Sequence, residues 1–388
     1  MGIISKIKDT FLINRQDSII FEVTQKCNND CLFCYNVWKC NTPLTPPTHP
    51  CTPLNRGDRG DYPKGELPTA ETKDLIRRIV KETSCKQLTF TGGEPLLRAD
   101  LPELITCAKS LGVSVTIISN GTLISEEIAR DYIKLGVGLF ELPMLSADRK
   151  IHNELSRNDA FDKVVESVAN IKLHRGRVVT VFVGTKRNID DLKEMIELSL
   201  AIGADGIMFN RFNVGGEGTR HIDELLPTPE QVIKALEVIE SAMEQYKIGI
   251  ACSIPIQPCI IDTNRFKKVH FGYCAAGTKR AYYTVDPLGN LRMCNHTPSI
   301  LGNIFKSSFR DLTARQKIKP FMDAVPEFCA DCRMVKTCQG GCKAAAEVSS
   351  SDCSLCAEEP FLKYYKNETL KKGLTDKKLS DKISSVAD

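Results

Sequence analysis

Apolar residues along this chain occur in short runs that alternate with segments of helical periodicity. The first run, residues 18–24, is rich in β-branched side chains and predicts a buried strand. Further strands are predicted at 87–91, 114–119, 139–145, 178–183 and 206–210. Apolar residues three and four positions apart predict helices at 69–81, 102–111, 125–135, 161–174 and 190–202. This alternation of six β/α units indicates an α/β fold, with a parallel sheet covered by helices.

Two stretches depart from this alternation. Residues 36–68 include the proline-rich segment Asn41–Pro50, which excludes a helix and predicts a long loop. Cys40 and Cys51 flank that segment, and we assign no ligand role to either. A lid or substrate-contacting loop and a mere insertion both remain open. Residues 363–388 are rich in lysine and poor in large apolar residues, which predicts a solvated helix or a disordered tail.

Composition adds one unusual feature, the cysteine content. Apolar residues make up 42% and charged residues 26%, and the net charge of +4 gives no argument for nucleic acid or an acidic membrane as a partner. No apolar run has the length of a signal peptide or of a membrane span. We therefore expect a cytoplasmic protein whose 17 cysteines are reduced and bound to metal.

Three of these cysteines form a C-x3-C-x2-C motif on the loop after the first strand, namely Cys27, Cys31 and Cys34. Folds of the α/β class place their chemistry at such strand ends. Three thiolates on one loop can hold three irons of a cubane cluster, which leaves the fourth iron open to bind a substrate. A zinc loop or a chance cluster of structural thiols is the alternative.

The motif, followed by the aromatic Tyr35, resembles that of the radical S-adenosylmethionine (SAM) superfamily. The resemblance implies that the open iron of a [4Fe–4S] cluster chelates the amino and carboxylate groups of SAM. Reduction of the cluster then cleaves SAM to methionine and a 5′-deoxyadenosyl radical, which abstracts a hydrogen atom from the substrate. The resemblance also implies a partial (β/α)6 TIM-like barrel, which periodicity alone does not separate from a doubly wound sheet.

The resemblance extends to polar residues at the ends of later strands. Gly92, Gly93 and Glu94 match the family's glycine-rich motif, which binds the SAM amino group. Ser119 and Asn120 look like the family's Thr-Asn-Gly motif, which lies near the ribose. Each of these could instead belong to a polar turn at the end of a strand.

After the fourth strand, Ser146 and Asp148 resemble a Ser-x-Asp motif, and Arg157 resembles an arginine that pairs with the SAM carboxylate. Asp148 is expected either to touch ligand or to cap the next helix. Residues 215–218 look like the family's glycine-rich stretch near the adenosyl group. Two more residues sit where relatives place site residues, with turn or surface roles equally open: Asn188 and Arg211.

A second cysteine block resembles the SPASM extension found on many radical SAM enzymes. The positions that match in spacing and order are Cys274, Gly289, Cys294, Cys329, Cys332, Cys338 and Cys342, followed by Cys353 and Cys356. Residues 282–291 independently predict a β-hairpin, because aromatic and β-branched residues flank an Asp-Pro-Leu-Gly-Asn turn. Such a hairpin would bring the first two cysteines of the block together.

In relatives this extension holds two auxiliary [4Fe–4S] clusters, which implies three clusters in all. The ligands carried over to the first are Cys274, Cys294 and Cys342, with Cys259 as upstream fourth ligand and Cys252 as its competitor. The ligands carried over to the second are Cys329, Cys332 and Cys338, closed by Cys356 or Cys353. A zinc site of four thiolates is the alternative. Cys85 and Cys107 are expected to be buried as small apolar residues.

These interpretations divide the chain into five parts. They are an N-terminal extension at 1–17, a radical SAM core at 18–225 with its insertion at 36–68, a helix and linker at 226–273, a SPASM domain of hairpin and cysteine-rich loops at 274–358, and a lysine-rich tail at 359–388.

We therefore expect a radical SAM/SPASM enzyme that modifies a peptide or protein, with auxiliary clusters that accept an electron or bind substrate. Small-molecule chemistry, such as decarboxylation of a haem-pathway type, is one alternative, and a non-catalytic iron–sulfur electron carrier or a zinc scaffold is another. An electron donor such as ferredoxin or flavodoxin is implied. Residues 1–17 leave no room for a leader-peptide module, so a separate leader-peptide-binding protein or the loop at 36–68 would recognise a peptide. No substrate-side acid or base can be named.

Overall fold

The computed structural model describes residues 16–38 and 65–371. The extension before residue 16, the proline-rich segment with Cys40 and Cys51, and the tail beyond residue 371 lie outside the described residues. Within the described ranges, no helix combines the length and the apolar character needed to cross a membrane.

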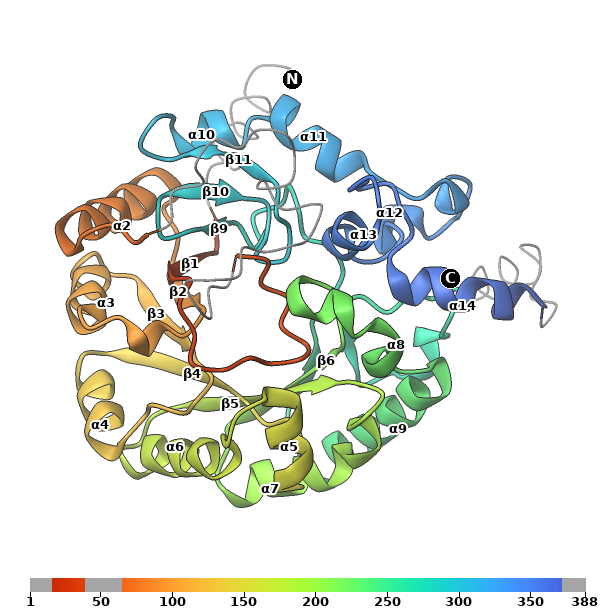
Figure 1. Ribbon diagram of the computed structural model, residues 1–388, viewed down its shortest axis with the longest axis horizontal. Helices are drawn as coiled ribbons and strands as arrows, with labels where there is room; N and C mark the ends of the chain where they lie inside the picture. Colours follow the sequence, from red (N-terminus) through yellow and green to blue (C-terminus); the bar gives the residue numbers. More distant parts are fainter. Residues whose placement is uncertain (1–15, 39–64, 372–388) are drawn as a thin grey trace, which may run out of the picture.

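Six parallel strands form the centre of the molecule and neighbour one another in chain order. They are β1 (Ser18–Thr24), β2 (Gln87–Gly92), β3 (Ser114–Ile118), β4 (Val137–Pro143), β5 (Val178–Gly184) and β6 (Gly206–Arg211). Figure 1 shows them as an arc with helices on its outer side. The predicted strands are confirmed, each end lying within two residues of its predicted position.

Helices follow each of these strands and cover the outer face of the arc (Figure 1). The longer ones are α2 (Thr69–Thr83), α3 (Leu101–Ser110), α4 (Glu126–Lys134), α5 (Arg149–Ser156), α6 (Phe161–Leu173), α7 (Leu192–Ala201) and α9 (Pro229–Tyr246). Short turns of helix are η2 (Pro95–Leu97), η3 (Ile189–Asp191), η4 (Gly216–Arg220) and α8 (Ile222–Leu225). Asp148 caps α5, because its side chain accepts hydrogen bonds from the backbone N–H groups of Lys150 and Ile151.

The sheet continues beyond the arc at both edges, so the barrel is partial and open. Beyond β6 lie β7 (Ile250–Cys252) and β8 (His270–Phe271). Beyond β1 lie β9 (Thr284–Val285), β10 (Asn290–Arg292) and β11 (Ile300–Asn303). β9 runs parallel to β1, and β9 and β10 form the predicted antiparallel hairpin. The fold is therefore the expected partial (β/α)6 barrel, joined edge to edge with the C-terminal hairpin.

The C-terminal region spans the open side of the arc between β1 and β6 (Figure 1). Its helices are α10 (Phe309–Leu312), α11 (Arg315–Asp323), α12 (Val335–Cys338), α13 (Lys343–Ser349) and α14 (Pro360–Lys371). Loops that carry cysteines connect several of them. The predicted hairpin with cysteine-rich loops is therefore present.

The main core lies between the sheet and the outer helices. Phe21, Phe90, Phe140, Phe182 and Phe209 point to that side from five of the six strands, and each side chain is 0% exposed. Burial of such side chains contributes about 1.5–3 kcal/mol each to folding. The strands are thereby held rigidly at their ends, where the site is built.

Two buried ion pairs join the barrel to the C-terminal region. Arg211 at the end of β6 pairs with Glu359 and lies over the ring of Phe361. Glu22 in the middle of β1 pairs with Arg292 of β10. All four charged side chains are almost fully buried. Arg211 thus has a structural contact with Glu359, which sequence patterns did not reveal.

Candidate functional site

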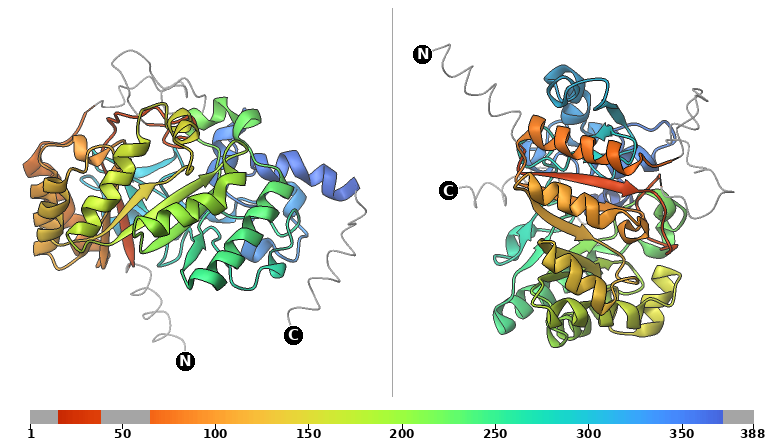
Figure 2. Two further views of the ribbon diagram at one scale, coloured as in Figure 1. Left: turned by 90° about the horizontal axis from the view of Figure 1, so that it is seen from below. Right: turned by 90° about the vertical axis from the view of Figure 1, so that its left-hand side faces the viewer.

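The loop that carries Cys27, Cys31 and Cys34 leaves the carboxyl end of β1 and crosses the centre of the arc (Figure 1). Figure 2 shows it at the arrowhead end of β1, where the parallel strands end together. We call residues 25–38 the cysteine loop. The backbone N–H of Cys34 donates to the carbonyl of Cys31 at 3.2 Å, which turns the second half of the loop back on itself.

The Gly92–Gly93 pair after β2 holds the start of the cysteine loop. The N–H of Gly93 donates to the carbonyl of Thr24 at 2.8 Å, and the N–H of Glu94 donates to that of Lys26 at 2.7 Å. A Cβ at Gly92 would lie 2.0 Å from the Thr24 oxygen, and one at Gly93 would lie 2.1 Å from the Lys26 oxygen. Glycine is therefore required here by close backbone packing against the cysteine loop.

A second glycine pair, Gly215 and Gly216, holds the other end of the loop. A Cβ at Gly215 would lie 2.9 Å from the carbonyl oxygen of Tyr35, and one at Gly216 would lie 2.6 Å from that of Cys34. Gly216 also has φ +44°, a conformation that favours glycine. The cysteine loop is thus fixed between the ends of β2 and β6, from opposite sides of the arc.

Glu94 connects the glycine motif to the end of β3. Its carboxylate accepts hydrogen bonds from the Ser119 hydroxyl at 2.9 Å, from the N–H of Asn120 at 2.6 Å and from the N–H of Leu96 at 3.1 Å. Burial raises the pKa of Glu94 to about 7, against the opposing effect of these donors. The structure therefore brings three of the predicted SAM-site residues into direct contact.

Asn28 joins this group from the cysteine loop, although sequence reasoning did not single it out. The Asn120 amide donates to Asn28 at 2.7 Å, and Asn28 donates to the hydroxyl of Thr122 at 2.8 Å. The sequence did contain a signal for this role, because Asn28 is a polar residue within the C-x3-C-x2-C motif. The contact fixes the register between the cysteine loop and the end of β3.

Ser146 and Arg157 lie on the β4 side of the site. Ser146 is fully buried, donates to Asp191 at 2.8 Å and accepts from the N–H of Asp148 at 2.9 Å. Arg157 is part-exposed and reaches Asp30 of the cysteine loop and Glu217 of η4, each at 3.3 Å. Arg157 therefore lies beside the cysteine loop, whereas Ser146 has its hydroxyl engaged within the fold.

Asn188, the other position with an open role, is part of a buried turn. Its amide donates to the carbonyls of Leu145 and Val183, and its side-chain oxygen accepts from the N–H of Thr185. It is 1% exposed. Asn188 therefore stabilises the turn after β5.

The C-terminal thiols fall into two groups. In the first group, the pKa of Cys294 is raised to about 12. Burial is the main cause, and the neighbouring thiolates of Cys342 and Cys274 add to it. In the second group, the pKa of Cys259 is raised to about 12. Burial is again the main cause, and the nearby thiolates of Cys338, Cys329 and Cys332 add to it. The thiols within electrostatic reach of one another are thus Cys274, Cys294 and Cys342 on one side, and Cys259, Cys329, Cys332 and Cys338 on the other.

This grouping revises the expected place of Cys259. Sequence order suggested that it would complete the first group, but the chain after β7 carries it to the second. Its competitor Cys252 ends β7, is 3% exposed and has its pKa raised by burial, with no thiol among the causes. Cys252 is therefore a core residue, as Cys85 and Cys107 also are.

The two candidates for the fourth ligand of the second auxiliary cluster, Cys353 and Cys356, differ in oxidation state. Cys353 is disulfide-bonded, whereas Cys356 is a free, exposed thiol. Burial lowers the pKa of Lys343, and the nearby thiolates of Cys274 and Cys356 oppose that effect. Cys356 thus has Lys343 as a neighbour in common with Cys274, and its expected role as closing ligand of the second group stays a prediction.

The donor set suits iron–sulfur clusters. A cluster distributes its thiolates over separate irons. Two groups of buried or half-buried thiols within electrostatic reach, beside a loop with three more, have the chemistry that cluster ligation needs.

A row of buried and half-buried polar and aromatic side chains runs from the cysteine loop to the first thiol group. The ring of Tyr35 stacks on His296 with centroids 4.0 Å apart, and its hydroxyl accepts from Asn295 at 2.8 Å. Nδ1 of His296 lies 3.1 Å from the amide nitrogen of Asn213, which also donates to Sγ of Cys342 at 3.3 Å. Burial, with the Arg292 charge, lowers the pKa of His296 to about 4, so the imidazole is neutral and accepts this hydrogen bond.

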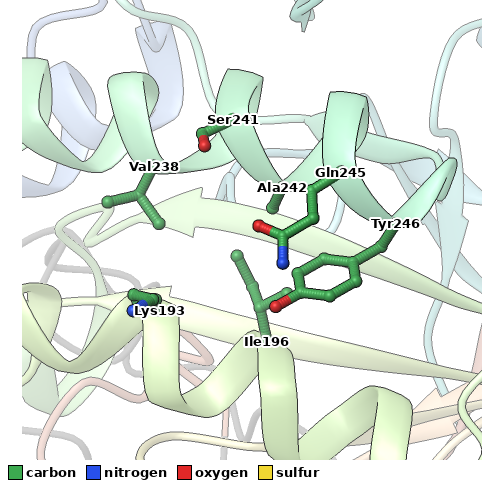
Figure 3. Close-up of a pocket in the computed structure, with 7 residues that line it drawn as sticks. All are labelled: Lys193, Ile196, Val238, Ser241, Ala242, Gln245 and Tyr246. Carbon is green, nitrogen blue, oxygen red and sulfur yellow. The ribbon is translucent and has the colours of Figure 1, made fainter.

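A small crevice on the outer surface is unrelated to this site. It lies between α7 and α9, encloses about 80 Å³ and is lined by Lys193, Ile196, Val238, Gln245 and Tyr246 among others (Figure 3). These residues belong to the helical layer, on the far side of the sheet from the barrel interior. It is a gap in helix packing with one aromatic edge.

Comparison with known proteins gives a family match and similar folds. The family model described as "Radical SAM superfamily" matches residues 21–199. SuiB of Streptococcus suis bound to its precursor peptide SuiA has a TM-score of 0.68 at 14% identity, covering 92% of this chain and 77% of SuiB. Native anSMEcpe with bound AdoMet and Kp18Cys peptide has a TM-score of 0.65 at 18% identity, covering 95% of this chain and 99% of that chain. At these identities the two structures show a shared fold.

Proposed function

This chain is a radical SAM superfamily enzyme, and from that premise we propose that it modifies a peptide or protein with the help of two auxiliary iron–sulfur clusters. The observation that carries the proposal is the row from Tyr35 to Cys342, which links the cysteine loop to a second set of half-buried thiols. A fold that needed only SAM cleavage would have no use for that second set.

In this proposal, each predicted residue of the SAM site has its own role. Cys27, Cys31 and Cys34 would hold the SAM-binding cluster, whose reduction supplies the deoxyadenosyl radical. Gly92 and Gly93 fix the loop that holds it, while Glu94, Ser119 and Asn120 present hydrogen-bonding groups at the strand ends for SAM. Arg157, beside Asp30, supplies a cation for the SAM carboxylate. Ser146 supports this surface by ordering the turn after β4.

The C-terminal thiols would hold the auxiliary clusters. Cys274, Cys294 and Cys342 would bind the first, with Cys356 nearby as a fourth thiol. Cys259, Cys329, Cys332 and Cys338 would bind the second. We propose that these clusters accept the electron left on the product or hold the substrate, and that a ferredoxin or flavodoxin reduces the enzyme.

A peptide substrate is supported by the folds that this chain shares. SuiB was captured with its precursor peptide SuiA and anSMEcpe with the Kp18Cys peptide, and both superpose over more than nine-tenths of this chain. A separate leader-binding protein would supply further recognition.

The first test counts iron and sulfide on anaerobically reconstituted protein and assays 5′-deoxyadenosine after addition of SAM and reductant. We expect about twelve irons per chain and deoxyadenosine formation. Replacing Cys27, Cys31 and Cys34 with alanine should remove about four irons and all cleavage. Four or fewer irons in the unaltered protein, with bound zinc and no deoxyadenosine, would contradict the proposal.

The second test concerns the substrate. Short peptides encoded by reading frames next to the gene are incubated with enzyme, SAM and reductant, and their masses are compared before and after. A mass change that depends on SAM supports peptide modification. Cleavage of SAM that no peptide stimulates, together with turnover of a small molecule, would place the enzyme in the alternative class.

A further inference from the structure

The barrel-facing wall formed by β4, β5 and β6 is not filled by core side chains. Along each of these strands the helix-facing residues are buried and the barrel-facing ones are only half-buried. Leu139, Val181 and Met208 are barrel-facing examples, and none of them belongs to the hydrophobic core. A closed TIM barrel fills its interior with layers of side chains. The half-buried wall is therefore partly open to solvent on the barrel side.

Glu141 lies in this wall, at the centre of β4. Strand register places it beside Ile118 of β3 and Val179 of β5, with Leu139 and Pro143 two residues away on the same face. Its surroundings are thus apolar on every side along the sheet. Burial raises the pKa of its carboxyl group, and no neighbouring charge contributes.

No hydrogen-bond or ion-pair partner of the Glu141 carboxylate occurs in the part of the chain that the structure describes. Another carboxylate on the barrel side, Glu22, is paired with Arg292 and also accepts from Gln25 at 2.8 Å. A carboxylate in apolar surroundings without a partner costs free energy. Such groups concentrate at functional sites, where a ligand completes them.

The position of Glu141 also connects it with the SAM site. The N–H of Ser119 donates to its backbone carbonyl at 3.1 Å, and Ser119 is the residue that contacts Glu94. Glu141 therefore lies one strand away from the motif expected at the ribose. A group bound to its carboxylate would lie on the barrel side of the sheet, one strand from Ser119.

We propose that Glu141 binds the cationic side chain of a lysine or arginine residue in the substrate peptide. This inference rests on the proposed function, since it names the class of peptide that the same site accepts. The wall matches such a side chain in two parts. The aliphatic stem would lie along Leu139, Pro143 and Val179, and the charged end would reach the carboxylate.

A selection from a random-sequence peptide library, with each peptide displayed on its encoding RNA, tests the proposal even though the natural substrate is unidentified. The reconstituted enzyme is immobilised with SAM, and bound peptides are sequenced. We expect enrichment of lysine or arginine at one position, and a loss of that enrichment by about tenfold or more in E141Q. In E141K the enrichment should change to aspartate or glutamate, because the charge of the wall is inverted.

The matched control is E127Q, which removes the same charge from an exposed position on α4. It should select the same peptides as the unaltered enzyme. Circular dichroism and iron content of each variant show whether it is folded and loaded. Equal enrichment of basic residues by E141Q and the unaltered enzyme would overturn the proposal.

A second measurement separates a SAM contact from a peptide contact. If E141Q weakens SAM binding while the selected peptides stay unchanged, Glu141 serves the cofactor and the proposal is wrong. If the unaltered enzyme cleaves SAM but enriches no peptide, the peptide substrate itself is wrong and the proposal falls with it. Absence of SAM cleavage in the unaltered, iron-loaded enzyme would instead contradict the proposed function.

Discussion

Glu94 makes a prediction about stability and pH. Its pKa rises from 4.5 to about 7 on folding because the carboxyl group is buried. Between these values the folded state keeps a proton that the unfolded state has released, so stability falls as pH rises. A difference on the order of 3 kcal/mol is expected across this range.

E94Q should lack this dependence. Urea unfolding of metal-free protein at a series of pH values measures it as the difference between the two proteins. The glutamine will lower stability overall, since its amide nitrogen cannot accept from the N–H of Asn120. Parallel pH profiles for the two proteins would show that Glu94 does not hold a proton in the folded state.

Asn213 makes a prediction about a reduction potential. Its amide donates to Sγ of Cys342, and hydrogen bonds to cluster sulfurs stabilise the reduced, more negative state. Replacing Asn213 with leucine, which is similar in size and cannot donate, should therefore lower the potential of the first auxiliary cluster. A redox titration followed by electron paramagnetic resonance measures the shift.

The clusters that we propose for the cysteine loop and for the second thiol group serve as controls in the same sample. Within the described ranges, the hydrogen bonds of the Asn213 amide go to His296 and Cys342, and neither residue is a ligand of those two clusters. Their potentials should stay unchanged. If the potential of the first auxiliary cluster also stays unchanged, the Asn213 amide does not reach the ligating sulfur once iron is bound.

At the scale of elements, the cysteine loop depends on glycine pairs from two distant strands. G93A should displace the loop, because the new Cβ would lie 2.1 Å from the Lys26 oxygen. We expect it to lose about four irons and SAM cleavage while the auxiliary irons remain. Iron analysis together with the deoxyadenosine assay measures both effects.

G249A is the matched control for this substitution. A Cβ at Gly249 would meet nothing within 4 Å, and its φ lies outside the positive range that favours glycine. It should keep all its irons and its activity. A G93A protein that retained iron and cleavage would show that the cysteine loop tolerates a shift at Lys26.

The β/α alternation could be predicted because each strand has a buried apolar face and its helix follows at regular spacing. Helix α5 could not, since Arg149 and Lys150 begin it and it is only 8 residues long. The grouping of Cys259 was also hidden, because spacing along the chain does not say which way residues 253–273 turn. The polar row through Asn213 and His296 depends on contacts between distant segments, which no single-sequence pattern records.

At the scale of the molecule, buried ion pairs hold the C-terminal region against the barrel. Replacing Arg211 with methionine leaves the Glu359 charge buried and should lower the free energy of unfolding by about 3–5 kcal/mol. Replacing both residues with methionine should cost less than the sum of the single changes, because no charge is left unpaired. Urea denaturation of the three variants measures this coupling, and strictly additive effects would show that the pair is not a unit.

The pairing of β9 with β1 has a consequence for synthesis on the ribosome. Ile20 and Phe21 lie beside Thr284 and Val285, so the strand that leads into the cysteine loop gains its second neighbour only when most of the chain has emerged. Until then β1 is an exposed edge strand, open to pairing with other chains. A nascent chain that stalls after the barrel should therefore need protection by a chaperone. Stable loading of iron should follow release from the ribosome, when both glycine pairs and the hairpin are in place.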